Sequence, residues 1–255
     1  MRSRLLLASA LAIVVASALT GCASIDPGPT VTQARVITDV SAVELDTSGD
    51  LTVTLGATPS LTVIAGERII DRLTADIDGG VLRLGMDGDG MLRSGEIRYE
   101  LTVSSLESMT VLGSGDAVAD FSGATAPTIT VRGSGDVEAT GLRAAEAVLT
   151  IDGSGAIAVR DAAVADLRVR IDGSGGVAID GTADAQHVEI HGDGGYEAAG
   201  LRSTDAVVAI AGAGGAAVTA DGTLDATIDG SGDIEYGGHP RVTEDVSGSG
   251  DVMRR

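Results

Sequence analysis

The stretch Ile228-Asp229-Gly230-Ser231-Gly232-Asp233-Ile234 decides the fold, because the chain of 255 residues keeps repeating its central Gly-Ser-Gly-Asp. Full copies begin at Gly113, Gly133, Gly230 and Gly248, and altered copies begin at Gly153, Gly173, Gly192 and Gly212. Successive copies start 20, 20, 20, 19, 20, 18 and 18 residues apart. A fixed period of this size predicts a repeat architecture, in which each copy is one unit stacked on the next.

Apolar and polar side chains alternate through each copy, which is the signal of a β-strand with one buried face. Two residues before the first glycine, every copy carries a β-branched aliphatic side chain: Val111, Val131, Ile151, Ile171, Ile190, Ile210, Ile228 and Val246. The period places each of these side chains next to its equivalent in the following unit. The sequence therefore predicts an all-β fold, a right-handed parallel β-helix (β-solenoid) with coils of about 20 residues and aliphatic ladders inside.

The glycines of the motif have a backbone explanation. Gly-Ser-Gly between two strand segments permits positive φ angles and a sharp bend without a clash of a Cβ atom. A glycine-rich phosphate-binding loop is the functional alternative, but no lysine follows the motif and no helical pattern begins after it. The motif therefore indicates a corner of a coil and not a nucleotide site.

Residues 1–21 have the features of an export signal, with Arg2 and Arg4 ahead of the short apolar run Leu5–Leu19. The run is too short for a typical transmembrane helix. It ends in Leu19-Thr20-Gly21-Cys22, which resembles the bacterial lipobox. That resemblance implies that the cysteine becomes the lipidated first residue of the mature protein. Cys22 is the only cysteine in the chain, so a disulfide within it is excluded.

The remaining residues divide into three segments. Residues 22–34 are expected to form a lipidated tether, because Pro27, Gly28 and Pro29 favour an irregular spacer. Residues 35–108 are expected to form irregular β-strands that cover the N-terminal end of the solenoid, with a hairpin around residues 78–80 and a partial copy of the motif at residues 47–50. Residues 109–255 are expected to form the regular solenoid repeats of the same domain.

The chain is strongly acidic. It contains 17 basic and 37 acidic residues, and without residues 1–21 it would keep 15 basic against 37 acidic residues. This balance argues against nucleic acid as a partner and against attachment to an anionic membrane by charge. We therefore expect contact with the membrane through the lipid anchor, and an envelope or surface component or a second copy as the binding partner.

Three features together resemble a known bacterial family: an export signal, about 70 residues of irregular strands, and then coils that carry Gly-Ser-Gly-Asp-Val. The family is described as putative auto-transporter adhesin, head GIN domain, and the resemblance covers about Arg35–Val252. It implies an exported, β-helical protein of the surface or envelope, and it supplies no catalytic residues. The copies at 173–176, 192–195 and 212–215 depart from the full motif, because Gly replaces Asp in each of them.

Outward positions just before each bend carry charged side chains, among them Arg132, Asp152, Arg170, Asp172 and Glu189. Polysaccharide lyases and hydrolases with β-helical folds place acids and an arginine on such a face, so a polysaccharide-active enzyme is the alternative function. Opposite charges on neighbouring coils explain the pattern without chemistry. The three histidines do not have the spacing of metal ligands, and the loop that starts at Asp87 lacks the Gly and Glu of an EF-hand. We predict no catalytic residue, no cofactor and no metal centre.

Outward positions just after each bend are acidic at both ends of the solenoid and small in the middle, where they are Ala156, Ala158, Gly176, Ala178, Gly195, Gly215 and Ala217. Another protein can approach such a flat flank closely, so we predict a docking face for a partner or a second copy. The alternative is that the strands of residues 35–108 fold back and cover this flank. Stacked Asp116 and Asp136, about 5 Å apart, would repel by roughly 0.8 kcal/mol in water, which makes them a candidate cation-binding pair.

Overall fold

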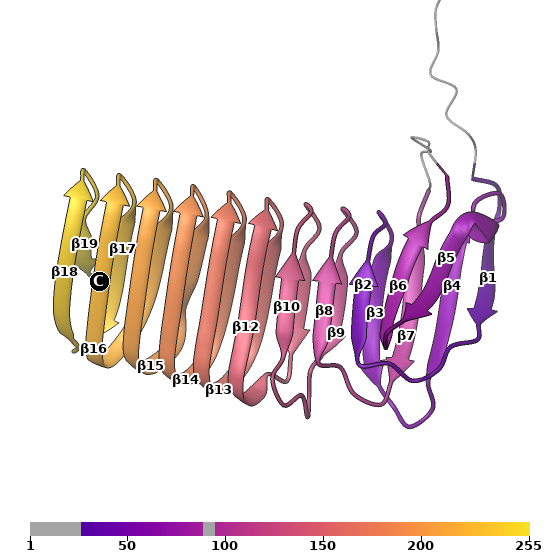
Figure 1. Cartoon of the computed structure of the whole chain (residues 1–255), viewed down its shortest axis with the longest axis horizontal. Coiled ribbons are helices and arrows are strands. Elements are labelled where there is room, and N and C mark those ends of the chain that lie inside the picture. The colour runs from indigo at the N-terminus through magenta and orange to yellow at the C-terminus, as the bar shows by residue number, and fades with distance from the viewer. Residues whose placement is uncertain (1–26, 89–94) are drawn as a thin grey trace, which may run out of the picture.

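A computed structural model describes residues 27–88 and 95–255, and over these residues the chain is a β-solenoid. It is 69% strand and has about 7 turns of roughly 20 residues. The coils lie side by side in one elongated body (Figure 1). The predicted solenoid fold and coil length are confirmed. Within the described ranges, no helix has the length and apolar content needed to cross a bilayer.

The irregular N-terminal part contains β1 (Thr30–Arg35), β2 (Ala42–Leu45), β3 (Asp50–Leu55), β4 (Ser60–Gly66), the 3₁₀ helix η1 (Ile70–Arg72), β5 (Leu73–Asp78), β6 (Val81–Met86) and β7 (Arg98–Val103). The solenoid continues with β8 (Ser108–Val111), β9 (Ala117–Asp120), β10 (Thr128–Val131), β11 (Val137–Thr140), β12 (Arg143–Gly153) and β13 (Ala156–Gly173). It ends with β14 (Gly176–Gly192), β15 (Gly195–Gly212), β16 (Gly215–Gly230), β17 (Asp233–Gly238), β18 (Arg241–Gly248) and β19 (Val252–Arg254). The long strands β13 to β16 are each continuous around most of one coil (Figure 1).

The first coils do not stack in the order of the sequence. Strand β2 lies between β6 and β8, and β3 lies between β7 and β9, with all four pairings parallel. The coil made by β2 and β3 therefore lies between two coils that come later in the chain, one made by β6 and β7 and the other by β8 and β9 (Figure 1). Strands β1 and β4 are added antiparallel beyond β7, and β5 is added antiparallel beyond β6. These strands, with Ile69 and Ile70 buried near η1, cover the N-terminal end as predicted.

Two local expectations have different outcomes. The hairpin is confirmed, because β5 and β6 pair with Asp78 opposite Val81 across the two-residue loop Gly79-Gly80. Both glycines have positive φ, 60° and 83°, which is the backbone geometry that a tight hairpin of this length requires. The predicted end of the tether at residue 34 is wrong. Residues 30–35 form β1 instead, because their alternating sequence lets Val31 pack against the core.

The predicted aliphatic ladder runs through the whole solenoid. All eight β-branched residues are in register from coil to coil, and Leu45 extends the ladder beyond Val111. Seven of the eight are buried, with Ile171 0% exposed between Ile151 and Ile190. Val246 differs and is 40% exposed, because β18 pairs only with β16 among the described strands. The register is therefore correct, and burial ends with the last coil.

Close stacking of the bends explains the glycines better than the φ angle alone. A Cβ atom on Gly133 would overlap the carbonyl oxygen of Gly113 in the preceding coil. Gly230 would meet the same obstacle at Gly212, and it also has a φ of 143°. The partial copy at residues 47–50 is part of the same column, because Gly115 donates its N–H to the carbonyl of Thr47.

One buried polar network interrupts the aliphatic interior. Gln186 occupies the ladder position that Leu167 holds one coil earlier, and it is fully buried. The hydroxyl of Tyr196 donates to Oε1 of Gln186 at 3.0 Å, and Nε2 of Gln186 donates to Ser203 Oγ at 2.8 Å. Ser203 then donates to the carbonyl of Thr219. Burial raises the pKa of Tyr196 above its ordinary value. Its hydroxyl therefore remains a neutral hydrogen-bond donor at neutral pH.

Candidate functional site

The charged face before the bends is neutralised by its own ion pairs. Arg132 lies 3.5 Å from Asp152 on the next coil. Arg170 contacts Asp172 at 2.8 Å and Glu189 at 3.4 Å. The pairs Arg132–Asp152 and Arg170–Glu189 join opposite charges on neighbouring coils, as expected, and all three pairs lie at the surface, where each contributes little to stability. The arginines are engaged by carboxylates of the same chain, so this face has the arrangement of a solvated surface.

The histidines do not form a metal centre. His191 Nδ1 lies 2.9 Å from Asp172 Oδ1, and His187 Nε2 lies 3.9 Å from Asp166 Oδ2. In the part of the chain that the structure describes, no group of three or more His, Cys, Asp or Glu side chains could hold a metal ion. The loop after Asp87 falls mainly on residues 89–94, outside the described residues.

The aspartates of the motif have a structural role that the sequence did not reveal. Four of them, Asp50 of the partial copy and Asp116, Asp136 and Asp233, each accept a hydrogen bond from the backbone of the next coil through the Oδ1 atom. Asp116 accepts from the N–H of Asp136 at 2.8 Å, and Asp136 accepts from the N–H of Ala156 at 2.8 Å. Asp50 and Asp233 make the same bond, with Asp116 and Asp251 as the donors. The motif Asp therefore fastens neighbouring coils at their bend.

The altered copies make this bond in another way. After Ala156, which has no carboxylate, the N–H of Gly176 donates to the carbonyl of Gly155 at 3.3 Å. The N–H groups of Gly195 and Gly215 likewise donate to glycine carbonyls of the preceding coil. The backbone therefore supplies a substitute acceptor for the N–H groups of Gly176, Gly195 and Gly215 where the preceding copy has no Asp.

We expect Asp136→Ala to lower the free energy of unfolding by no more than about 1 kcal/mol, the usual net worth of one hydrogen bond, because a backbone carbonyl can accept the N–H of Ala156 as it does in the altered copies. Asp136→Asn keeps an Oδ1 acceptor and should cost less than half as much in urea unfolding.

The cation at Asp116 and Asp136 stays a prediction, and the same two variants test it. A calcium-dependent rise in melting temperature that is present in the wild type and absent from Asp136→Asn would support the cation, and equal responses would count against it.

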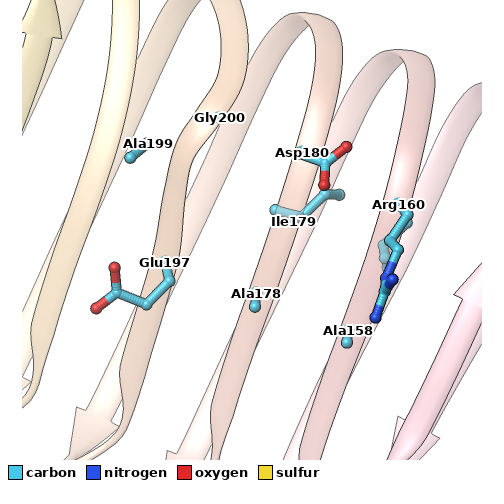
Figure 2. Close-up of a pocket in the computed structure, with 9 residues that line it drawn as sticks. Ala158, Arg160, Ala178, Ile179, Asp180, Glu197, Ala199 and Gly200 are labelled. Atoms are coloured by element: carbon cyan, nitrogen blue, oxygen red, sulfur yellow. The ribbon is translucent and has the colours of Figure 1, made fainter.

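The flank of small residues contains a shallow hollow of about 330 Å³. Figure 2 shows its floor, where Ala158, Ala178 and Glu197 lie on three neighbouring coils. Arg160 and Asp180 lie beside this row and were not singled out in the sequence. They follow the Ala positions by two residues, so their place on the same outward face could have been read from the alternation.

The flank is not covered by the N-terminal strands. Ala158 is half-buried and Ala178 is exposed, and β1 to β7 pair at the end of the stack instead of lying along its side. The alternative that residues 35–108 fold back over the flank is therefore wrong.

At the rim of the hollow, Asp180 Oδ1 accepts the N–H of Asp161, whose φ of 55° is unusual for a residue with a side chain. This bond fixes the corner between two coils.

Comparison with known proteins identifies the family. The model of the family described as putative auto-transporter adhesin, head GIN domain, matches residues 39–240. The chain belongs to this family. The match contains the charged face, the flank of small residues and all but the last motif copy, and it confirms the resemblance seen in the sequence. No curated protein matches the chain.

Three solved structures are similar to this chain in fold. A protein from Parabacteroides distasonis, described as a putative lipid binding protein, has a TM-score of 0.84 and 25% identity, covering 89% of this chain and 97% of its own. A putative adhesin from the same organism has a TM-score of 0.81 at 20% identity, over 89% and 98% of the two chains. A putative adhesin from Parabacteroides merdae has a TM-score of 0.78 at 22% identity, over 89% and 97%. The family description fits a protein exposed at the surface or envelope, and these structures show the shared fold.

Proposed function

We propose that this chain is an exported envelope protein, anchored to the outer side of the cell membrane through a lipid on Cys22, that acts as a non-catalytic binding or structural module. Family membership supports an adhesin-like role. Cys22 lies outside the described residues, so the anchor rests on the lipobox sequence alone. The observation that carries the binding role is the uncovered flank of small residues, with its shallow hollow at Ala158 and Ala178.

The charge distribution supports a binding module over a polysaccharide-active enzyme. A catalytic arginine and acid need free groups directed at a substrate, whereas Arg132 and Arg170 are engaged by carboxylates on their own or the neighbouring coil. Binding of a lipid inside the coils, which the description of one relative could suggest, gains no support from the described core, because aliphatic side chains fill it.

We expect the double variant Ala158→Arg, Ala178→Arg to lose its partner while it keeps its fold. Two long cationic side chains would fill the hollow and hold a partner away from the flank. The matched control is Ala209→Arg, Ala211→Arg, which adds the same charge to small outward residues before the bend. The measurement is quantitative crosslinking and pull-down from membranes of producing cells, together with thermal melting.

The proposal predicts that crosslinked products are lost in the Ala158/Ala178 variant and kept in the control. Unchanged products in both folded variants would show that this flank is not the binding face. If only the Ala158/Ala178 variant fails to fold, the flank serves internal packing, and the binding role is contradicted in the same way.

A further inference from the structure

The last described coil, made by β18 and β19, is paired with the rest of the solenoid on one side only. Strand β18 pairs with β16, and β19 pairs with β17, and neither has a second neighbour among the described strands. In the described structure, the outer edges of β18 and β19 therefore present backbone N–H and C=O groups that pair with no strand, and such groups are a template for another strand. Val246 and Met253 are 40% and 41% exposed on these edges, and Val242 and Val252 are only partly buried.

Charged residues occupy two ladder positions in this coil. Glu244 is in register with Ala226, which is 2% exposed and continues the column that contains Val208. Arg254 is in register with Tyr236, which follows the fully buried Val218. In parallel strands in register, paired residues point to the same face of the sheet. The side chains of Glu244 and Arg254 therefore leave the backbone toward the interior of the coil. The guanidinium of Arg254 donates to the carbonyl of Gly238 at 2.9 Å and is thereby held at the edge.

We propose that Glu244 prevents two copies of this chain from joining end to end through β18 and β19. The N-terminal end of the solenoid is covered by antiparallel strands, so a two-fold contact of the C-terminal edges is the self-association that the coils would otherwise favour. In such a contact β18 would pair antiparallel with its copy, and β19 with its copy, and the two cores would become one.

The position of Glu244 blocks the contact in each register that keeps the two cores aligned. Inward residues of β18 must face inward residues of the copy, which are Val242, Glu244 and Val246. Centring the pairing on residue 243, 244 or 245 places Glu244 opposite Val242, Glu244 or Val246 of the copy, respectively. Each arrangement buries a carboxylate against an aliphatic side chain or against a second carboxylate, and both are unfavourable. Natural sheets use inward-pointing charges in this way to protect their edges.

The test compares Glu244→Val with Asp245→Val in the full chain, purified in the same detergent and followed by sedimentation velocity over a wide range of concentrations. Asp245 lies on the same strand, is exposed and points outward, so the control removes the same charge at the adjacent residue. We expect the wild type and Asp245→Val to stay monomeric. Glu244→Val should form a dimer with a dissociation constant at least roughly a hundredfold lower, because two buried carboxylates are removed at once and each 1.4 kcal/mol is a factor of ten.

Glu244→Ala restores the residue type found one coil earlier and provides a second variant if Glu244→Val does not fold. Dimerisation of Glu244→Ala with a monomeric Asp245→Val also supports the proposal. It is overturned if folded Glu244→Val and Glu244→Ala remain monomeric, if Asp245→Val dimerises equally, or if the wild type already dimerises through β18. None of these outcomes depends on the flank around Ala158, so failure here is distinguishable from failure of the proposed binding face.

Discussion

Ile171→Asp is expected to lower the free energy of unfolding by several kcal/mol, because it would bury a carboxylate without a partner. Ile171 is fully buried in the ladder between Ile151 and Ile190, and strands continue on both sides of it, so the new charge cannot reach solvent by a small shift. At about 2–4 °C per kcal/mol for a chain of this size, the melting temperature should fall by roughly 10 °C or more.

The control for this variant is Thr150→Asp, which adds the same carboxylate to the outward face of the neighbouring coil. Thr150 is half-buried and in register with Arg170, so the new charge would have solvent and a cation nearby. We expect a change within about 0.5 kcal/mol, as for most surface substitutions. Equal melting shifts for Ile171→Asp and Thr150→Asp would contradict the inward and outward assignment of the whole repeat.

The repeated part of the fold could be predicted because its period and its side-chain alternation coincide. Each ladder residue recurs at the coil length, so the pairing register follows from the sequence spacing, as Ile151, Ile171 and Ile190 show. Seven buried members confirm this. The exposure of Val246 was not foreseen, because the pattern describes the direction of a side chain and not whether another coil covers it.

The order of the first coils could not be predicted from the same signal. Alternation predicted strands within residues 35–108, but it contains no information about which coil lies next to which. The partial motif at residues 47–50 was the useful clue, because it stacks directly on the copy that begins at Gly113. The turn of the chain outward to β4 and back through β7 depends on packing at the end of the stack, which local sequence does not encode.

The candidate site shows the same limit. The ion pairs Arg132–Asp152 and Arg170–Glu189 between neighbouring coils followed from the register and are confirmed, whereas Arg170–Asp172 lies within one strand. The structural role of Asp116 and Asp136 did not follow from the register. The repulsion between their side chains suggested a cation, whereas each carboxylate accepts a hydrogen bond from a backbone N–H group of the next coil. Gln186 was also missed, although a polar residue at a ladder position could have suggested a buried network.

Cys22→Ala is expected to release the protein from the membrane fraction or to leave it unprocessed. Acyl chains on a cysteine stabilise attachment by about 0.8 kcal/mol for each buried CH₂ group, and their loss removes the attachment. Charge offers no substitute, because residues 22–255 contain 15 basic against 37 acidic residues.

The most direct test of a lipid-anchored envelope module is fatty-acid labelling of producing cells, followed by separation of membrane and soluble fractions. The wild type should incorporate the label and sediment with the membranes. Cys22→Ala should carry no label and should appear in the soluble fraction or as the uncleaved precursor. Mass spectrometry of the N-terminus distinguishes the precursor from the cleaved chain. A correctly cleaved, unlabelled Cys22→Ala protein that remains in the membrane fraction would contradict the account.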